Sequence, residues 1–494
     1  MRGALRPLLA GALAVTLGAC ASAPANVKLV RHDPDAGYRY ANLASDDGSE
    51  ELFVILAFSG GGTRAAAFSF GVMEGLREAA YRTAEGERRL LDDVDVIASV
   101  SGGSFTAAYY ALFPGTFFAD FPRDFLHRNI ERALVWRALR PWNWLRLAAP
   151  GFSRIHLAAE LYDETVFRHK TFGDVARKPF VIVNATDMTL GRRFEFTQEQ
   201  FDLLCSDVAQ TKIATGVAAS SAFPGLLSPL TLRNFAAEGC GYRPPEWLES
   251  ARVREANPLA RYARARDLWS YQDPAPARPF IHLLDGGLAD NIGLRGPYVA
   301  LGSGDTEWSV SAKLGNPVRR VVVITANAKT KPFKDWDQRA SPPGLLDVLG
   351  FVASGPMDNY SFDTVQLVRD FFRQQAQAER ARASCERQMQ KICPDARLPG
   401  VLSEAAYHAI ELSFDGVADE RLRRCLENLP TSFALKEAQV TLLRQAGRAL
   451  LMTSKDVLDV MHALDPAWQP SGTTIDPALI GQACPDPASR GTVR

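Results

Sequence analysis

Two short apolar segments, each followed at once by a glycine-rich turn, constrain the fold of this chain more than any other feature. Residues 52–58 (LFVILAF) and 94–100 (VDVIASV) have the length and apolar character of buried β-strands. Residues 60–62 (GGG) follow the first strand, residues 101–103 (SGG) follow the second, and a helical pattern begins at each turn. Strand–turn–helix units of this kind are typical of a parallel sheet covered by helices.

The rest of the chain extends this pattern and then changes character. Further strands are expected at residues 179–184, 193–196, 279–284 and 319–325. Their alternation with helices predicts an α/β sandwich around a largely parallel sheet. After about residue 340 helical periodicity dominates, for example over 364–382 and 434–451. This change predicts a helical C-terminal addition packed on the α/β core.

The N-terminus has the pattern of a targeting segment. Two arginines precede an apolar run over residues 8–17, which is too short to span a bilayer. Residues 17–20 (LGAC) resemble a bacterial lipobox, so Cys20 is expected to be lipidated and to become the first mature residue. A plain signal peptide with a small-residue cleavage site is the alternative. Because Ala21 is not the Asp that favours inner-membrane retention, the resemblance favours an exported protein anchored in the outer membrane.

These features divide the chain into a signal peptide over residues 1–20, a polar tether over 21–50, an α/β domain over 51–335 and the helical addition over 336–494. Besides Cys20, the chain holds Cys205, Cys240, Cys385, Cys393, Cys425 and Cys484. An even number favours disulfides in an exported protein, and Cys205 and Cys240 bracket one segment, but the pairing stays open. None of the spacings is typical of a zinc site, and no metal is expected.

The turn after the second strand has the small-x-Ser-x-Gly form of a nucleophile elbow. Ser99, Ser101 and Gly103 occupy its three defining positions, with Ser99 in place of the usual glycine. A serine on such a turn exposes its hydroxyl above a helix N-terminus, where backbone amides and the positive end of the helix dipole lie close. The alternative is a glycine-rich turn in which Ser101 only caps the helix.

The turn after the first strand suits the binding of a developing negative charge. Without Cβ atoms, Gly60, Gly61 and Gly62 let backbone amides approach a bound ester closely, and such preorganised donors stabilise the oxyanion of acyl transfer. Arg64 follows directly. The alternative is a dinucleotide fingerprint, because Gly60-x-Gly62-x-x-Ala65 fits that pattern loosely. An exported protein is a poor place for a nicotinamide cofactor, so no cofactor is expected.

An Asp-Gly-Gly sequence, Asp285-Gly286-Gly287, ends another expected strand. An acid there can point at a neighbouring strand end while the backbone turns sharply. It lies far from Ser101 along the chain, so only the fold could bring the two together. An ordinary Asp-Gly turn is the alternative.

In this order, the glycine loop, the serine elbow and the Asp-Gly-Gly motif resemble the patatin-like phospholipase family. Residues 218–224 (AASSAFP) are similar to the family's Ala-Ser-x-Ala-x-Pro segment, and Asn291 also matches. The resemblance covers about residues 50–330, with Ser99 and Ala65 as departures. It implies a three-layer α/β/α sandwich in which residues 51–335 are the catalytic domain.

The resemblance also implies roles for individual residues. Ser101 would be the nucleophile, Asp285 its partner in a dyad without histidine, and the 60–62 loop an oxyanion hole supported by Arg64. The implied activity is hydrolysis of a phospholipid or another lipid ester, of the phospholipase A or lysophospholipase type. An inert lipid-binding lipoprotein with the same fold is the alternative function. Nucleic acid is not an expected partner, since Lys plus Arg and Asp plus Glu number 56 each.

Histidines and a tryptophan-rich segment complete the sequence picture. A Ser-His-Asp triad would need a histidine after Asp285, but His408 and His462 lie in helical-looking stretches. His282 precedes Asp285 by three residues in one strand, so alternation points it to the opposite face. Residues 134–147 hold three Trp and three Arg among apolar residues, which suits a membrane interface. The alternative is a helix pair that packs its tryptophans into the core.

Overall fold

The computed structural model describes residues 25–43, 51–149, 151–175, 178–245, 248–249, 260–273, 278–302, 318–331, 336–338, 340–395 and 405–484. Its centre is an eight-stranded sheet in the order β12-β11-β2-β5-β6-β10-β9, with β7 paired to β6. The bounds are β2 (Leu52–Phe58), β5 (Val94–Val100), β6 (Phe180–Asp187), β7 (Arg192–Glu195), β9 (Leu230–Arg233), β10 (Phe280–Asp285), β11 (Arg320–Asn327) and β12 (Ala406–Ser413). The strands from β12 to β6 run parallel, whereas β7, β9 and β10 are antiparallel to their neighbours.

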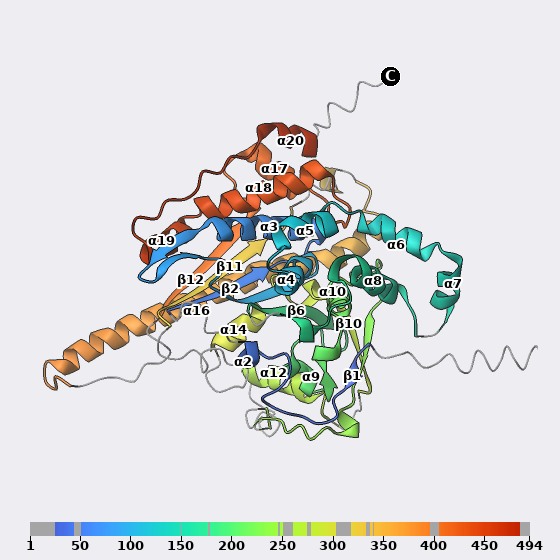
Figure 1. Cartoon of the computed structure of the whole chain (residues 1–494), viewed down its shortest axis with the longest axis horizontal. Helices are drawn as coiled ribbons and strands as arrows, with labels where there is room; N and C mark the ends of the chain where they lie inside the picture. The colour runs from blue at the N-terminus through green and yellow to red at the C-terminus, as the bar shows by residue number, and fades with distance from the viewer. Residues whose placement is uncertain are drawn as a thin grey trace, which may run out of the picture.

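Helices cover both faces of this sheet. Figure 1 shows α3 (Gly62–Glu78), α5 (Phe117–Phe121) and α18 (Glu437–Thr453) on one side, and α9 (Gln198–Asp202), α12 (Ala260–Trp269) and α14 (Arg295–Gly302) on the other. The central strands β2 and β5 are buried almost throughout, as continuous apolar runs in a doubly covered sheet should be. This confirms the predicted three-layer α/β/α sandwich with a mainly parallel sheet.

The C-terminal region is part of this core. The expected helical periods lie in α16 (Leu345–Gln390) and α18, but residues 406–413 form β12, which pairs with β11 along its whole length. α18 packs along α3, where Gly71 and Gly447 allow close backbone approach and Arg444 pairs with Glu74. The C-terminal addition is thus mainly helical, as predicted, but it also supplies one strand to the central sheet. The helical assignment of His408 was wrong, because this residue lies in β12. Local periodicity missed this strand because β11, its partner among the described strands, lies 86 residues earlier, as the pairing of Arg320 with Ala406 shows. Turn signals do not reveal a pairing over such a distance.

The described part of the expected tether, residues 25–43, also packs on the domain. β1 (Val27–Lys28) pairs with β8 (Ser206–Asp207). The buried Tyr38 donates its hydroxyl hydrogen to the carbonyl of Val181 at 2.8 Å, and Arg39 pairs with Asp202 at 2.5 Å. This stretch therefore differs from a free tether because its aromatic and charged side chains find partners on the core. Cys20 and the expected signal peptide lie outside the described residues.

Two disulfides link four of the six described cysteines. Cys205 bonds to Cys240, and Cys425 bonds to Cys484, which joins α17 (Glu420–Glu427) to the end of α20 (Pro477–Ala483). Cys385 and Cys393 are exposed and unbonded. Within the described ranges, no helix is both long enough and apolar enough to cross a membrane.

Candidate active site

Ser101 lies at the turn between β5 and α4 (Gly102–Leu112), in a backbone conformation that few residues adopt. Its φ is 50° and its ψ is −117°, and strain of this kind is found mostly at functional sites. The glycines that follow make the turn possible. A Cβ on Gly102 would overlap the carbonyl of Gly62, and one on Gly103 would lie 2.7 Å from Phe58 Cβ. The turn thus has the form of a nucleophile elbow.

Asp285 lies at the end of β10 and reaches the elbow across β6. β6 stands between β5 and β10, and its Asn184 pairs with Val100 of β5. The next residue of β6, Ala185, pairs with Asp285. This register brings the two candidate catalytic residues together, and Ser101 Oγ donates a hydrogen bond of 2.9 Å to Asp285 Oδ2.

The environment of Asp285 makes it a stronger base than an exposed aspartate. The residue is buried, and its second oxygen, Oδ1, accepts the amide of Gly287 at 2.8 Å. Burial raises the pKa of Asp285 to about 7, against the smaller opposing effect of the hydrogen bonds from Gly287 and Ser101. A carboxylate with a pKa near neutrality accepts a hydroxyl proton more readily than one with the ordinary value.

Ser220, at the end of α10 (Ile213–Ser220), ties the elbow to the Asp-Gly-Gly turn. Its hydroxyl accepts the amide of Ser101 at 2.8 Å and donates to the carbonyl of Asn184 at 2.6 Å. Its carbonyl accepts the amide of Gly286 at 3.1 Å. Gly286 must be glycine because a Cβ there would overlap the Asn184 carbonyl. Sequence reasoning gave Ser220 no role, although the Ala-Ser-x-Ala-x-Pro segment was the signal that could have found it.

The glycine loop lies between β2 and α3 and faces the elbow. The amide of Gly60 is already bonded to the carbonyl of Asn291 at 3.0 Å, and a Cβ on Gly60 would collide with the Asn291 side chain. Among the described residues, no acceptor is found for the amides of Gly61 and Gly62. These two amides are the donors that the loop can offer to an oxyanion, and Gly60 contributes by its lack of a side chain.

Arg64, expected to support the loop, is buried in the first turn of α3. Its Nε donates to the carbonyl of Ala328 at 3.0 Å. Its Nη1 donates to the carbonyl of Leu429 at 2.9 Å and to Thr431 Oγ1 at 2.8 Å. Arg64 thereby fixes the start of α3 to the end of β11 and to the segment that precedes α18.

A cavity of about 340 Å³ opens over the serine and the aspartate. The glycine loop, Ser101 and Asp285 line it together with Phe223, Leu226, Met357, Thr431, Ser432 and Phe433, among others. Met357 belongs to α16, and residues 431–433 precede α18, so the C-terminal region lines part of the cavity. The sequence analysis had assigned every site residue to the first 335 residues. Four apolar side chains lie among mostly polar lining residues, and they offer a surface that suits an acyl chain: Phe223, Leu226, Met357 and Phe433.

Histidine takes no part in this arrangement. Of the described residues that line the cavity, none is a histidine. His282 lies on the exposed face of β10 against Thr231, and His462 contacts the carbonyl of Trp468. In the described part of the chain, no group of three or more His, Cys, Asp or Glu side chains is placed to hold a metal ion.

The tryptophan-rich segment forms a helical hairpin beside the cavity. α6 (Ile130–Ala138) and α7 (Pro141–Ala148) stand out from the body in Figure 1, and Glu131 near the start of α6 lines the cavity. Trp136, Trp142 and Trp144 are 61%, 58% and 59% exposed. Arg137, whose side chain is only 14% exposed, lies on the inner side instead and pairs with Glu160 of α8 (Arg154–Tyr162). The alternative in which the tryptophans pack into the core does not hold.

Comparisons with known proteins show what this part of the chain is similar to. The sequence model of the family described as patatin-like phospholipase matches residues 56–298, a span that contains the glycine loop, Ser101 and Asp285. No curated protein matches the chain. Among solved structures, the chain is similar to human GIVD cytosolic phospholipase A2, with 14% identity and a TM-score of 0.32 over 62% of this chain and 46% of that chain. The match therefore spans less than half the length of the human protein.

VipD from Legionella pneumophila is also similar, with 10% identity and a TM-score of 0.30 over 84% of this chain and 67% of that chain. The family model, which covers the loop, the elbow and the Asp-Gly-Gly turn in one continuous match, is the informative comparison. Residues 56–298 of this chain form a patatin-like phospholipase domain.

Proposed function

We propose that this chain hydrolyses carboxylic esters of lipids, with Ser101 as nucleophile and Asp285 as general base. The observation that carries the proposal is the hydrogen bond from Ser101 Oγ to Asp285 Oδ2 inside a cavity that also holds the glycine loop. The patatin-like phospholipase domain supports a lipid ester as substrate. An acyl ester of a phospholipid or lysophospholipid is the substrate class that we propose.

The reaction follows from the positions of these groups. Asp285 accepts the hydroxyl proton while Ser101 Oγ attacks the ester carbonyl carbon. The amides of Gly61 and Gly62 stabilise the oxyanion that forms. The tetrahedral intermediate collapses to an acyl-enzyme, and the alcohol leaves with the proton from Asp285. Water then gives its proton to Asp285 and attacks the acyl carbon, which frees the fatty acid and returns the proton to Ser101.

The α6–α7 hairpin is the surface through which we propose that the enzyme meets its lipid. Leu139 and Leu145 of the hairpin are exposed together with the three tryptophans. Leu226, one of the residues that line the cavity, is also 48% exposed. Exposed tryptophan beside arginine suits the headgroup region of a bilayer, and Arg140 lies over the Trp142 ring. Contact through this hairpin would bring an acyl chain to the apolar side chains that line the cavity.

The position of the chain in the cell is a separate proposal. We propose that Cys20 carries the lipid and holds the chain at the outer membrane, on the basis of the LGAC sequence at residues 17–20 and of Ala21. Mass spectrometry of the mature N-terminus from cells fractionated into inner and outer membranes tests both parts. An unmodified N-terminus would contradict the anchor, and recovery with the inner membrane would contradict the location.

Fluorophosphonate labelling of the full chain, with the adduct mapped by mass spectrometry, tests the catalytic assignment. We expect an adduct on Ser101 that is lost in Asp285→Asn, because the hydroxyl is then no longer next to a base. Ser221→Ala is the matched control, since Ser221 lines the same cavity but its hydroxyl is bonded to the carbonyl of Val217. An adduct on another residue would refute the dyad. Folded protein that takes no label would favour the inert lipid-binding alternative.

A further inference from the structure

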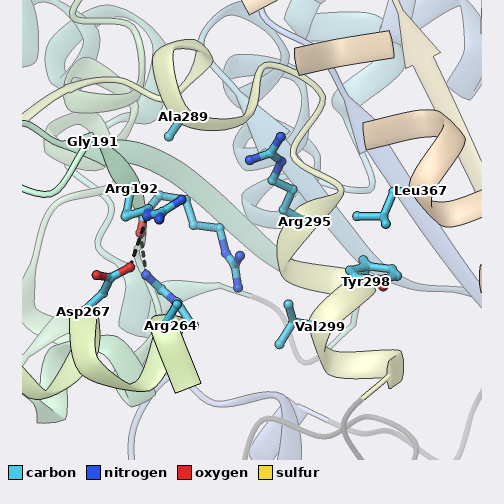
Figure 2. Close-up of a pocket in the computed structure, with 11 residues that line it drawn as sticks. Gly191, Arg192, Arg264, Asp267, Ala289, Arg295, Tyr298, Val299 and Leu367 are labelled. Carbon is cyan, nitrogen blue, oxygen red and sulfur yellow. Dashed lines mark hydrogen bonds and ion pairs between the residues drawn. The ribbon is translucent and has the colours of Figure 1, made fainter. Parts of the chain in front are cut away.

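A second cavity, of about 260 Å³, lies beside α13 (Gly287–Asp290), the short helix of the Asp-Gly-Gly motif. Ala289 of α13 lines it, and the other walls come from β7, the turn before it, α12, α14 and α16. Figure 2 shows Arg192 and Arg264 on one side of the cavity and Leu367 on the other. None of its lining residues lines the cavity over Ser101, and ester hydrolysis as proposed makes no use of it.

Arginine dominates the polar lining of this second cavity. The four arginines are Arg192, Arg193, Arg264 and Arg295. The first pairs with Asp267 at 3.1 Å and the second with Glu195 at 2.6 Å. In the described part of the chain, Arg264 and Arg295 form no ion pair with a carboxylate. The cavity therefore carries cationic groups in excess of the acids that contact them.

Arg264 has hydrogen-bond donors to spare. Its Nε is buried without a partner among the described residues, and its terminal nitrogens make only long contacts, 3.4 Å to the carbonyl of Arg193 and 3.5 Å to Gln200 Oε1. Burial, and next the neighbouring charge of Arg193, lower the pKa of Arg264 to about 10, so the group is still charged at neutral pH. A buried charged donor without an acceptor is costly, and a bound anion would supply the acceptor.

Arg295 is also short of acceptors. Its Nε donates to Thr364 Oγ1 at 3.0 Å, and its guanidinium lies 5.3 Å from the centre of the Tyr360 ring. Asp290 accepts the backbone amide of Arg295, and burial raises the pKa of that carboxyl, which makes Asp290 a weaker counter-ion. The planar guanidinium matches the paired oxygens of a carboxylate or phosphate.

The remaining walls of the cavity are apolar and include Ala263, Ala289, Val299 and Leu367. We propose that this cavity binds an oxyanion that carries an alkyl chain, with the oxyanion on Arg264 and Arg295 and the chain along the apolar walls. A free fatty acid and an alkyl phosphate share this chemistry. The inference does not depend on the proposed hydrolysis, because binding is tested on the inactive Ser101→Ala chain.

Isothermal titration of the full-length Ser101→Ala chain with octanoate, octyl phosphate and inorganic phosphate tests the site. We expect octanoate or octyl phosphate to bind at one site that Arg264→Met and Arg295→Met each weaken at least about tenfold. Arg373→Met is the matched control, since it removes one exposed arginine from α16 away from the cavity. The active-site cavity keeps its lining in all of these variants, so ligand bound there would not respond.

The outcomes separate the two ligand sources. Binding of octanoate alone assigns the cavity to a fatty-acid carboxylate, and binding of octyl phosphate alone assigns it to an alkyl phosphate. Inorganic phosphate that binds as tightly as octyl phosphate refutes the role of the apolar walls. Absence of binding for all three, or equal binding by the arginine variants, overturns the proposal. If Arg264→Met fails to fold, Leu367→Glu replaces it, because this exposed residue can place a carboxylate at the cavity wall and should abolish binding.

Discussion

Replacing Asp285 by Asn should remove activity and, at alkaline pH, stabilise the fold. Asn keeps the shape of the side chain and can keep both hydrogen bonds. Its oxygen can accept the amide of Gly287, and its NH₂ group can donate to Ser101 Oγ, with the direction of the second bond reversed. What the substitution removes is the negative charge, in a site where burial opposes that charge.

The magnitude follows from the raised pKa of Asp285. The pKa is about 7 in the folded chain and 3.8 as the ordinary value. Each pKa unit corresponds to about 1.4 kcal/mol, so the fold favours the protonated carboxyl by about 4 kcal/mol. Because the folded pKa is the higher one, this stability is present below about pH 4 and is lost as the pH rises from 4 through 7. Asn does not ionise in this range, so the variant does not lose this stability as the pH rises.

Urea unfolding of the native chain and of Asp285→Asn, at pH 4 and pH 8, measures the effect. We expect the variant to gain up to about 4 kcal/mol relative to the native chain between the two pH values, while its ester hydrolysis falls at least about a thousandfold. Asp92→Asn is the control, because Asp92 is exposed and forms a surface ion pair with Arg89. A gain in relative stability below about 1 kcal/mol would mean that ionised Asp285 does not destabilise the fold. The argument that burial raises the pKa of Asp285 and makes it a stronger base would then be refuted.

Three further predictions test the rest of the site. The kcat/KM for a soluble ester should fall about tenfold per pH unit below about pH 7, because only ionised Asp285 can accept the proton, and a plateau that extends below pH 5 would contradict this. Gly102→Ala should lower kcat about a hundredfold, since its Cβ would push the oxyanion loop out of place, whereas Gly115→Ala, with open space around it, should match the native chain in the same kinetic assay. Joint replacement of Trp142 and Trp144 by Ser should lower the hydrolysis of vesicle lipid about tenfold or more and leave the soluble ester unaffected. Equal losses on both substrates would argue for a structural role of the hairpin.

Much of the fold could be predicted because its signals are local. The strands at residues 52–58 and 94–100 have the bounds that their apolar runs indicated, and both glycine turns open helices as expected. Local signals could not predict β12 or the packing of residues 25–43 on the domain. Their residues have ordinary local patterns, and what holds them is contact with parts of the chain far away in sequence.

By itself, the sequence determined the chemical groups and their local geometry: Ser101 on a turn that its glycines permit, a loop of amides without side chains, and Asp285 at a strand end. Only the tertiary structure decided how these groups meet. The order β5-β6-β10 places Asp285 beside Ser101, and Ser220 ties the two turns together across β6. The pKa of Asp285 likewise belongs to the fold, because it is the removal of water by surrounding residues, and no feature of the strand itself, that raises it.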